Sequence, residues 1–186
     1  YMTEIRAIIN NNELTFIANC VLDYAEIETG GDYFGFWTKD GMPVIKYVTG
    51  PGKNTTRTST SFYQDIAYLH KCGDYLHSKY GLEHIGSWHS HHRLALDHPS
   101  SGDVSTMKKS LLAQKFDKFF ITICNIVSSD EVSINGFLFS NSFIDIYESS
   151  NWVVLPDASP YRREVDHKVN FITLPKTRKG KFKISK

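Results

Sequence analysis

Apolar residues recur at helical and strand spacings along the first 140 positions of the chain. Apolar side chains three and four positions apart share one face of a helix, which predicts helices over about 13–26, 62–80 and 103–112. Short β-rich runs bounded by turn residues predict strands over 33–38, 43–48, 84–91, 119–127 and 131–139. Asp40-Gly41 is a strong hairpin signal, so the first two strands should pair antiparallel. From Asn151 onward the pattern weakens and predicts no element.

The length and charge distribution predict one domain followed by a basic tail. The chain has 186 residues, of which 41% are hydrophobic, and this is enough for one substantial core. We expect the domain to span residues 1–175 and the tail residues 176–186. The tail holds six basic residues and no acidic one, which leaves residues 1–175 with a net charge of −5. We expect a solvated extension and no nucleic-acid partner.

The cysteines and the hydropathy of the chain indicate the cellular compartment. Cys20, Cys72 and Cys124 lie far apart and are odd in number, which argues against a disulfide framework and a cysteine zinc site. No stretch approaches the run of about 20 apolar residues that a membrane helix requires. The start of the chain also lacks the layout of a signal peptide. We therefore expect a soluble, cytoplasmic protein with no membrane partner.

Histidines cluster in one short segment and indicate a metal site. Five of the eight histidines fall within positions 84–98. Side chains alternate along a strand, so His89 and His91 point the same way and can bind one ion. Asp103 follows a loop and opens a helix, from which its carboxylate can return as a third ligand. Three nitrogen and oxygen ligands, with a fourth position for water, are typical of catalytic zinc. Taken singly, His-x-His is more often a surface pair, and Asp103 or Ser100 a helix cap.

A zinc hydrolase also needs a carboxylate that takes a proton from water and returns it to the leaving amine. Glu28 is the candidate, because it precedes Gly30-Gly31, where the backbone can pass close to the site. Glu26 is its nearest rival. Taken without the histidine motif, Glu28 is most simply interpreted as an exposed glutamate at the end of a helix.

The chain resembles the JAMM (JAB/MPN-type) zinc metalloproteases, in particular compact bacterial members. The resemblance lies in three motifs that occur in order: Glu28-Thr29-Gly30-Gly31-x-x-x-Gly35, Trp88-His89-Ser90-His91 and Ser100-x-x-Asp103. By pattern it covers roughly residues 5 to 140. It implies an α/β fold with a mixed central curved β-sheet flanked by helices, the JAB/MPN fold, which is cytidine-deaminase-like.

The resemblance also implies a site and an activity. Zn²⁺ would be bound by His89, His91 and Asp103, with Glu28 holding the catalytic water and Ser100 donating to the oxyanion. The implied reaction is hydrolysis of the peptide or isopeptide bond after the C-terminal tail of a ubiquitin-like protein, in deconjugation or precursor processing. The implied partners are that ubiquitin-like protein or its conjugates, and the activating and conjugating enzymes of its pathway.

One spacing departs from the family pattern. Eight residues, 92–99, separate His91 from Ser100, where the family usually has seven. The longer loop leaves open whether His92 or His98 supports the site or replaces a ligand.

Other functions remain open at this stage. One is a non-catalytic MPN-type scaffold that only binds partners. Another is a JAMM-type peptidase or small-molecule amide hydrolase unrelated to ubiquitin-like proteins, because a site fixes the chemistry better than the substrate. A metallo-β-lactamase-like hydrolase would use the histidines with Asp97, but that carboxylate comes too late in the chain for its motif.

Overall fold

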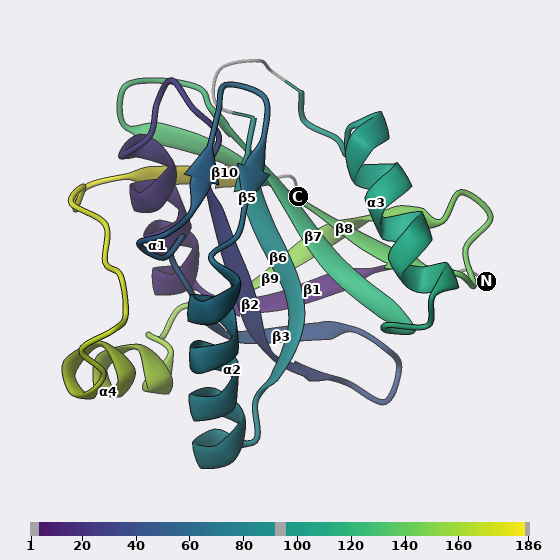
Figure 1. The fold of residues 1–186 in the computed structure, drawn as a ribbon, viewed down its shortest axis with the longest axis horizontal. Coiled ribbons are helices and arrows are strands. Elements are labelled where there is room, and N and C mark those ends of the chain that lie inside the picture. Colours follow the sequence, from purple (N-terminus) through teal and green to yellow (C-terminus); the bar gives the residue numbers. More distant parts are fainter. Residues whose placement is uncertain (1–3, 92–95, 185–186) are drawn as a thin grey trace.

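Seven strands of mixed direction form a closed barrel (Figure 1). The structure is a computed structural model that describes residues 4–91 and 96–184. The ring of paired strands runs β8–β7–β6–β2–β3–β1–β9 and returns to β8. Its strands are β1 (Arg6–Asn10), β2 (Gly30–Trp37), β3 (Pro43–Val48), β6 (Glu83–Ser90), β7 (Lys118–Ile126), β8 (Glu131–Ser140) and β9 (Tyr147–Leu155). A small hairpin, β4 (Thr56–Arg57) and β5 (Phe62–Tyr63), stands outside the ring.

The expected α/β fold, a mixed central curved β-sheet flanked by helices as in the JAB/MPN fold, is wrong, because the strands close into a barrel. The sheet closes because β9 pairs in parallel with β1 and antiparallel with β8. Neither β1 nor β9 was predicted. β1 has five residues, and the first half of β9 carries polar side chains at consecutive positions, Glu148 to Asn151. The apolar pattern that marks a strand is therefore weak in the two segments that decide the topology.

The predicted strands and helices are present: β3 has the predicted ends, and the ends of the others are shifted. The helices are α1 (Asn11–Leu22), α2 (Ile66–Tyr80) and α3 (Ser101–Leu112), and an additional helix, α4 (Pro160–Lys168), follows β9. α2 begins four residues later than expected, because the Asp65 carboxylate accepts a hydrogen bond from the Tyr68 N–H (3.0 Å) and caps the helix there. The preceding residues, Phe62 and Tyr63, form β5 instead. β2 and β3 pair antiparallel as predicted.

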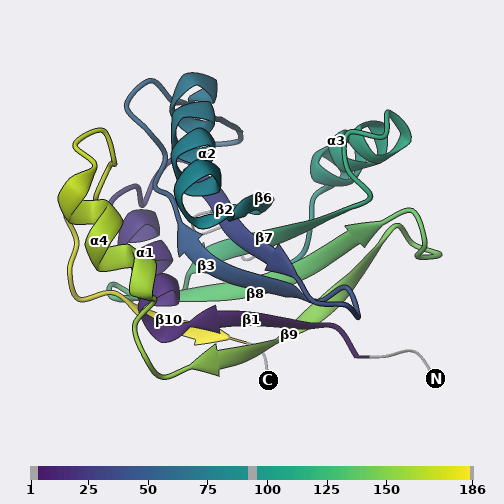
Figure 2. The same ribbon diagram turned by 90° about the horizontal axis from the view of Figure 1, so that it is seen from below.

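Alternation along β7 divides the core between the two faces of the barrel wall. Phe120 and Cys124 pack inside with the apolar side of α1. Phe119, Ile121 and Ile123 point outward and pack with residues of α3 and β8. A third cluster joins β2 and β3 to α2 and α4. Figure 2 shows the result: α1, α2 and α4 gather on one side, and α3 lies apart from them on the other.

A buried ion pair links α1 to α4. Glu13 is fully buried and accepts hydrogen bonds from the Val48 N–H (2.8 Å) and from Arg162 Nε (3.0 Å). The Arg162 guanidinium lies over the rings of Phe16 and Tyr47, at 3.9 Å and 4.3 Å from their centroids. One residue pair therefore holds two helices and β3 together.

Part of the basic tail belongs to the sheet. β10 (Lys181–Ile184) pairs in parallel with β8, and Lys181 Nζ lies 2.8 Å from an Asp130 carboxylate oxygen. Gly180 N–H donates to Asn19 Oδ1 (2.7 Å), which fixes the segment against α1. The three cysteines are free and buried. In the described ranges, no helix combines the length and the apolar character needed to cross a bilayer.

Candidate metal centre

The three predicted ligands converge in space. His89, near the end of β6, and His91, directly after β6, face the first turn of α3, where Asp103 lies. His89 Nε2 is 3.1 Å from His91 Nε2 and 3.3 Å from Asp103 Oδ1. His91 Nε2 is 3.7 Å from Asp103 Oδ2. Within the described residues, these three form the one set of His, Cys, Asp or Glu side chains placed to hold a metal ion.

The spacing of these atoms fits zinc. Atoms bound to zinc at about 2.0–2.1 Å and at tetrahedral angles lie about 3.3 Å from one another. His89 Nε2 lies 3.1 Å from His91 Nε2 and 3.3 Å from Asp103 Oδ1, both close to that value, and the separation of 3.7 Å joins His91 Nε2 to the other carboxylate oxygen, Oδ2. Two imidazole nitrogens and one carboxylate oxygen are also the donor types of catalytic zinc sites. The three side chains could therefore hold Zn²⁺ with little movement.

Neighbouring groups determine which ring nitrogen of His91 can bind a metal ion. His91 Nδ1 lies 3.1 Å from the Leu96 carbonyl oxygen, so in the neutral imidazole Nδ1 carries the hydrogen and Nε2 has the lone pair that a metal ion would need. Asn125 Nδ2 donates to the same carbonyl (2.8 Å) from the neighbouring strand β7. The Leu96 carbonyl is thus held in place, and it orients the imidazole toward Asp103.

Ser100 caps α3 and holds Asp103. Its backbone N–H and its hydroxyl both donate to Asp103 Oδ2, each at 2.7 Å. In return the Asp103 N–H donates to Ser100 Oγ (3.2 Å), which completes a capping box. The hydroxyl hydrogen of Ser100 is therefore directed at the carboxylate. To donate to an oxyanion, the Ser100 hydroxyl would have to break its hydrogen bond to Asp103.

Electrostatics keep the carboxylate ionised. Burial alone would raise the pKa of Asp103, but hydrogen bonds from His89, His91 and Ser100 hold it well below its usual range. Burial likewise lowers the pKa of His91, yet the bond to Asp103, a backbone carbonyl and the Glu28 carboxylate outweigh it and raise that pKa. The ionised form of Asp103 is the form that binds a cation.

Replacing Ser100 by Ala should lower zinc affinity by about tenfold to a hundredfold, as expected when a residue that orients a ligand is lost. Isothermal titration with Zn²⁺ against a competing chelator would measure it. Ser101→Ala, a change at the exposed neighbouring position, is the matched control and should bind like wild type. Unchanged zinc affinity together with slower turnover would contradict this role and favour the oxyanion role.

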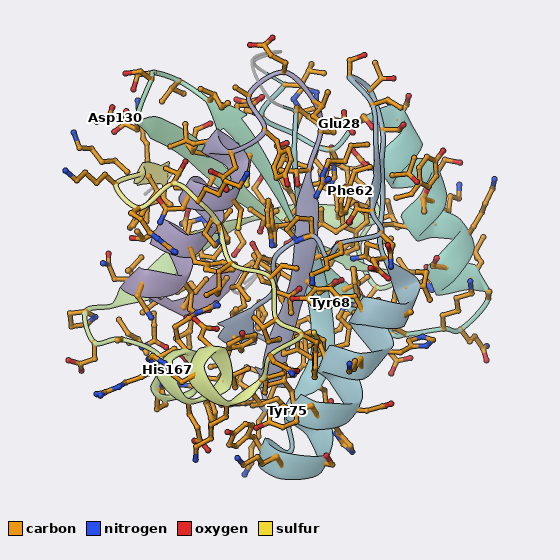
Figure 3. All side chains as sticks on the ribbon, turned by 60° about the vertical axis from the view of Figure 1, so that its left-hand side comes forward. Glu28, Phe62, Tyr68, Tyr75, Asp130 and His167 are labelled. Atoms are coloured by element: carbon orange, nitrogen blue, oxygen red, sulfur yellow. The ribbon has the colours of Figure 1, made fainter. Side chains whose placement is uncertain are left out.

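Glu28 lies at the same end of β6 as the ligands. Thr29 N–H donates to Ser90 Oγ (3.0 Å) and Ser90 N–H donates to the Thr29 carbonyl (2.8 Å), so the segment before β2 is tied to the strand that carries the histidines. The Glu28 N–H donates to the Thr58 carbonyl (2.9 Å) in the β4–β5 hairpin. Figure 3 shows Glu28 and Phe62 at one end of the molecule, far from Tyr75.

The structure separates Glu28 from its rival. Glu28 is buried and lines the cleft that contains the histidines, whereas Glu26 is exposed and does not line it. The two glycines that follow allow close packing, because a Cβ at Gly30 or Gly31 would collide with the carbonyl oxygen of Trp88 or Thr49. The sequence-based preference for Glu28 thus agrees with the geometry.

The alternative histidine His98 is not part of this cluster. His98 pairs with Asp97 (Nδ1 to Oδ1, 3.1 Å), and both side chains are largely exposed. This pair lines a different hollow from the one that contains His89 and His91. His92 lies outside the described residues.

A cleft of about 530 Å³ surrounds the candidate site. It extends from the three ligands along β6, between the β4–β5 hairpin on one side and α3 on the other. Sequence reasoning missed three polar residues at its far end, Asp32, Gln64 and His84. Asp32 stands inside a quoted motif, but at a variable position, and His84 has the wrong strand parity to share a face with His89. The sequence therefore carried no clear signal for them.

Comparisons with known proteins support the fold. No protein-family model matches the chain, and no curated protein matches it. A protein from Desulfitobacterium hafniense, solved in solution, is similar with a TM-score of 0.64 and 14% identity, over 82% of this chain and 94% of that one. A Salinibacter ruber protein is similar with a TM-score of 0.52 and 18% identity, over the same shares. At these identities the likeness shows the fold alone.

Proposed function

We propose that this chain is a zinc-dependent isopeptidase or peptidase with a JAMM-type site, which hydrolyses the bond after the C-terminal tail of a ubiquitin-like protein. The observation that carries the proposal is the meeting of His89, His91 and Asp103 in one cleft with Glu28. These residues come from three separate segments of the chain. A purely structural role would not require two histidines and two carboxylates to face one cleft.

The side chains divide the chemistry among them. His89, His91 and Asp103 would hold the zinc, which would supply Lewis acidity and lower the pKa of a bound water toward about 7. Glu28 takes the proton from the attacking water and returns it to the leaving amine. Ser100 keeps the Asp103 carboxylate oriented through its two hydrogen bonds. The Leu96 carbonyl does the same for the imidazole of His91.

The shape of the cleft suits an extended chain. Its lining includes residues of β6 from His84 to His89, so a peptide tail can lie along the strand until its last carbonyl reaches the ligands. The partner is then a ubiquitin-like protein or its conjugate, with the activating and conjugating enzymes acting on the same modifier. Free, buried cysteines agree with a cytoplasmic location for this pathway.

Mass spectrometry of a modifier fused to a reporter through its C-terminal tail tests this function. Zinc-loaded protein should release the modifier with its tail intact, and a chelator should stop the reaction. Short unrelated peptides serve as the comparison. Efficient cleavage of those peptides, with intact fusions across several candidate modifiers, would favour a peptidase unrelated to ubiquitin-like proteins.

We expect about one tightly bound zinc per chain, because three convergent ligands and a water satisfy its tetrahedral preference. Elemental analysis after expression in zinc-replete medium would measure the stoichiometry. A chain that carries no transition metal, and takes up none on reconstitution, would contradict the metal centre.

A further inference from the structure

A second polar cluster lies in the cleft, away from the metal ligands. The Asp32 carboxylate is almost completely buried, and its Oδ1 accepts hydrogen bonds from His84 Nε2 (3.0 Å) and from Gln64 Nε2. Its backbone N–H donates to Thr49 Oγ1 (2.9 Å), which fixes the residue on β2. The three side chains come from β2, from β6 and from the short segment between β5 and α2, so only the folded chain assembles them.

A bulge in β6 brings this cluster to the cleft. Strict alternation would place His84 on the opposite face from His89. Tyr33 pairs with Gly86 and Phe34 with His84, so Ile85 is an additional residue on β6. The bulge reverses the alternation, and His84 and His89 both line the cleft. The imidazole of His84 packs between the rings of Phe34 and Phe119, with centroids 5.4 Å away in each case.

The cluster presents hydrogen-bond acceptors to the cleft. Because Nε2 of His84 donates to Asp32, the other ring nitrogen of a neutral imidazole is an acceptor, and the side chain is one-third exposed (34%). Among the described residues that line the cleft, three are acidic and none is Lys or Arg. Asp103 is one of the metal ligands, and Glu28 acts beside them. Asp32 is the carboxylate that remains for a substrate.

Exposed apolar side chains lie close in sequence to Gln64, a hydrogen-bond partner of this carboxylate. Tyr63 and Ile66 both line the cleft and are 65% and 56% exposed. Arginine and lysine have long apolar stems and a charged end, and such side chains lay the stem along apolar surface while the charge meets an acceptor. The far end of the cleft therefore matches a basic side chain in both shape and charge.

We propose that Asp32 and His84 form a specificity subsite for a basic side chain of the substrate tail. This inference rests on the proposed function, which sets the direction in which the substrate tail lies in the cleft. Because of the bulge, His84 and His89 pair with Phe34 and Gly30, which are four residues apart on β2, or about 13 Å at about 3.3 Å per residue. An extended substrate advances by a similar distance per residue. The basic side chain therefore belongs about four positions before the scissile bond.

Peptide binding to the zinc-loaded Glu28→Gln variant tests the subsite without cleavage. The probes are labelled peptides with a Gly-Gly tail joined to lysine, carrying either arginine or its neutral isostere citrulline at each earlier position in turn. Fluorescence anisotropy should show on the order of tenfold tighter binding of arginine at one position, about four before the bond. Adding Asp32→Asn should remove the difference between arginine and citrulline.

Two further variants separate the subsite from general effects. Gln64→Lys places a cation against Asp32 and should also remove the preference for arginine. Asp40→Asn, at the exposed tip of the β2–β3 hairpin, makes the same charge change as Asp32→Asn. Asparagine suits this turn as aspartate does, so the variant should still prefer arginine over citrulline. Binding of the citrulline peptides reports whether each variant is folded.

The outcomes distinguish this inference from the proposed function. Equal binding of arginine and citrulline peptides by the parent, no measurable binding of either, or a preference that survives Asp32→Asn would overturn the subsite. Failure of wild type to cleave any tail fusion would overturn the hydrolase, while the binding difference would still stand.

Discussion

Replacing Glu28 by Gln should lower turnover by on the order of a hundredfold or more while zinc stays bound, because the positioned proton carrier is lost. Glu28 lines the cleft beside the ligands without being one of the three that converge. The amide has nearly the same shape as the carboxylate but cannot take a proton from water. Steady-state kinetics on a tail fusion, with zinc content measured on the same sample, would check both parts.

Two variants sharpen this result. Glu26→Gln is the matched control, because Glu26 is exposed and only two residues away, and it should retain wild-type turnover. His89→Ala should lose both the metal and the activity. Full activity in Glu28→Gln together with an inactive Glu26→Gln would show that the wrong glutamate had been chosen.

Replacing Glu13 by Gln should destabilise the fold by about 3–5 kcal/mol, because it leaves the Arg162 guanidinium buried without its main counter-charge. Arg162 Nη2 also donates to the Val48 carbonyl (2.7 Å), so the guanidinium cannot turn to solvent without losing a second contact. Urea unfolding of the metal-free protein, followed by far-UV circular dichroism, would give the free energy of unfolding.

An exposed ion pair provides the comparison. Glu164 lies 2.8 Å from Lys79 on the surface, and Glu164→Gln should leave the unfolding midpoint nearly unchanged because solvent screens this pair. The double variant Glu13→Leu with Arg162→Leu should recover part of the lost stability, since no uncompensated charge remains. Similar small losses for Glu13→Gln and Glu164→Gln would refute the structural importance of the buried pair.

Most of the elements could be predicted because their patterns are local. The helical spacing before Gly30 and the alternation in β7 each follow from side chains that are near in sequence. The closure of the barrel could not be predicted. It depends on β9 pairing with β1, whose residues lie about 145 positions apart, and no local pattern records such a partner.

The candidate metal site was determined largely by the sequence. The period of two along a strand placed His89 and His91 on one face, and the Ser100-x-x-Asp103 spacing is that of a capping box, which fixes Asp103 at the start of a helix. Their separations of 3.1 to 3.7 Å agree with this interpretation. Short-range geometry was sufficient here, because each ligand is set by the strand or helix that carries it.

Only the tertiary structure decided what surrounds those ligands. The hydroxyl of Ser100 is directed at Asp103, the bulge at Ile85 turns His84 toward the cleft, and Asp32 meets His84 across two strands. A bulge depends on the pairing of neighbouring strands, and a hydrogen bond between strands depends on their register. Both are properties of the closed barrel, and the order of residues along one segment does not contain them.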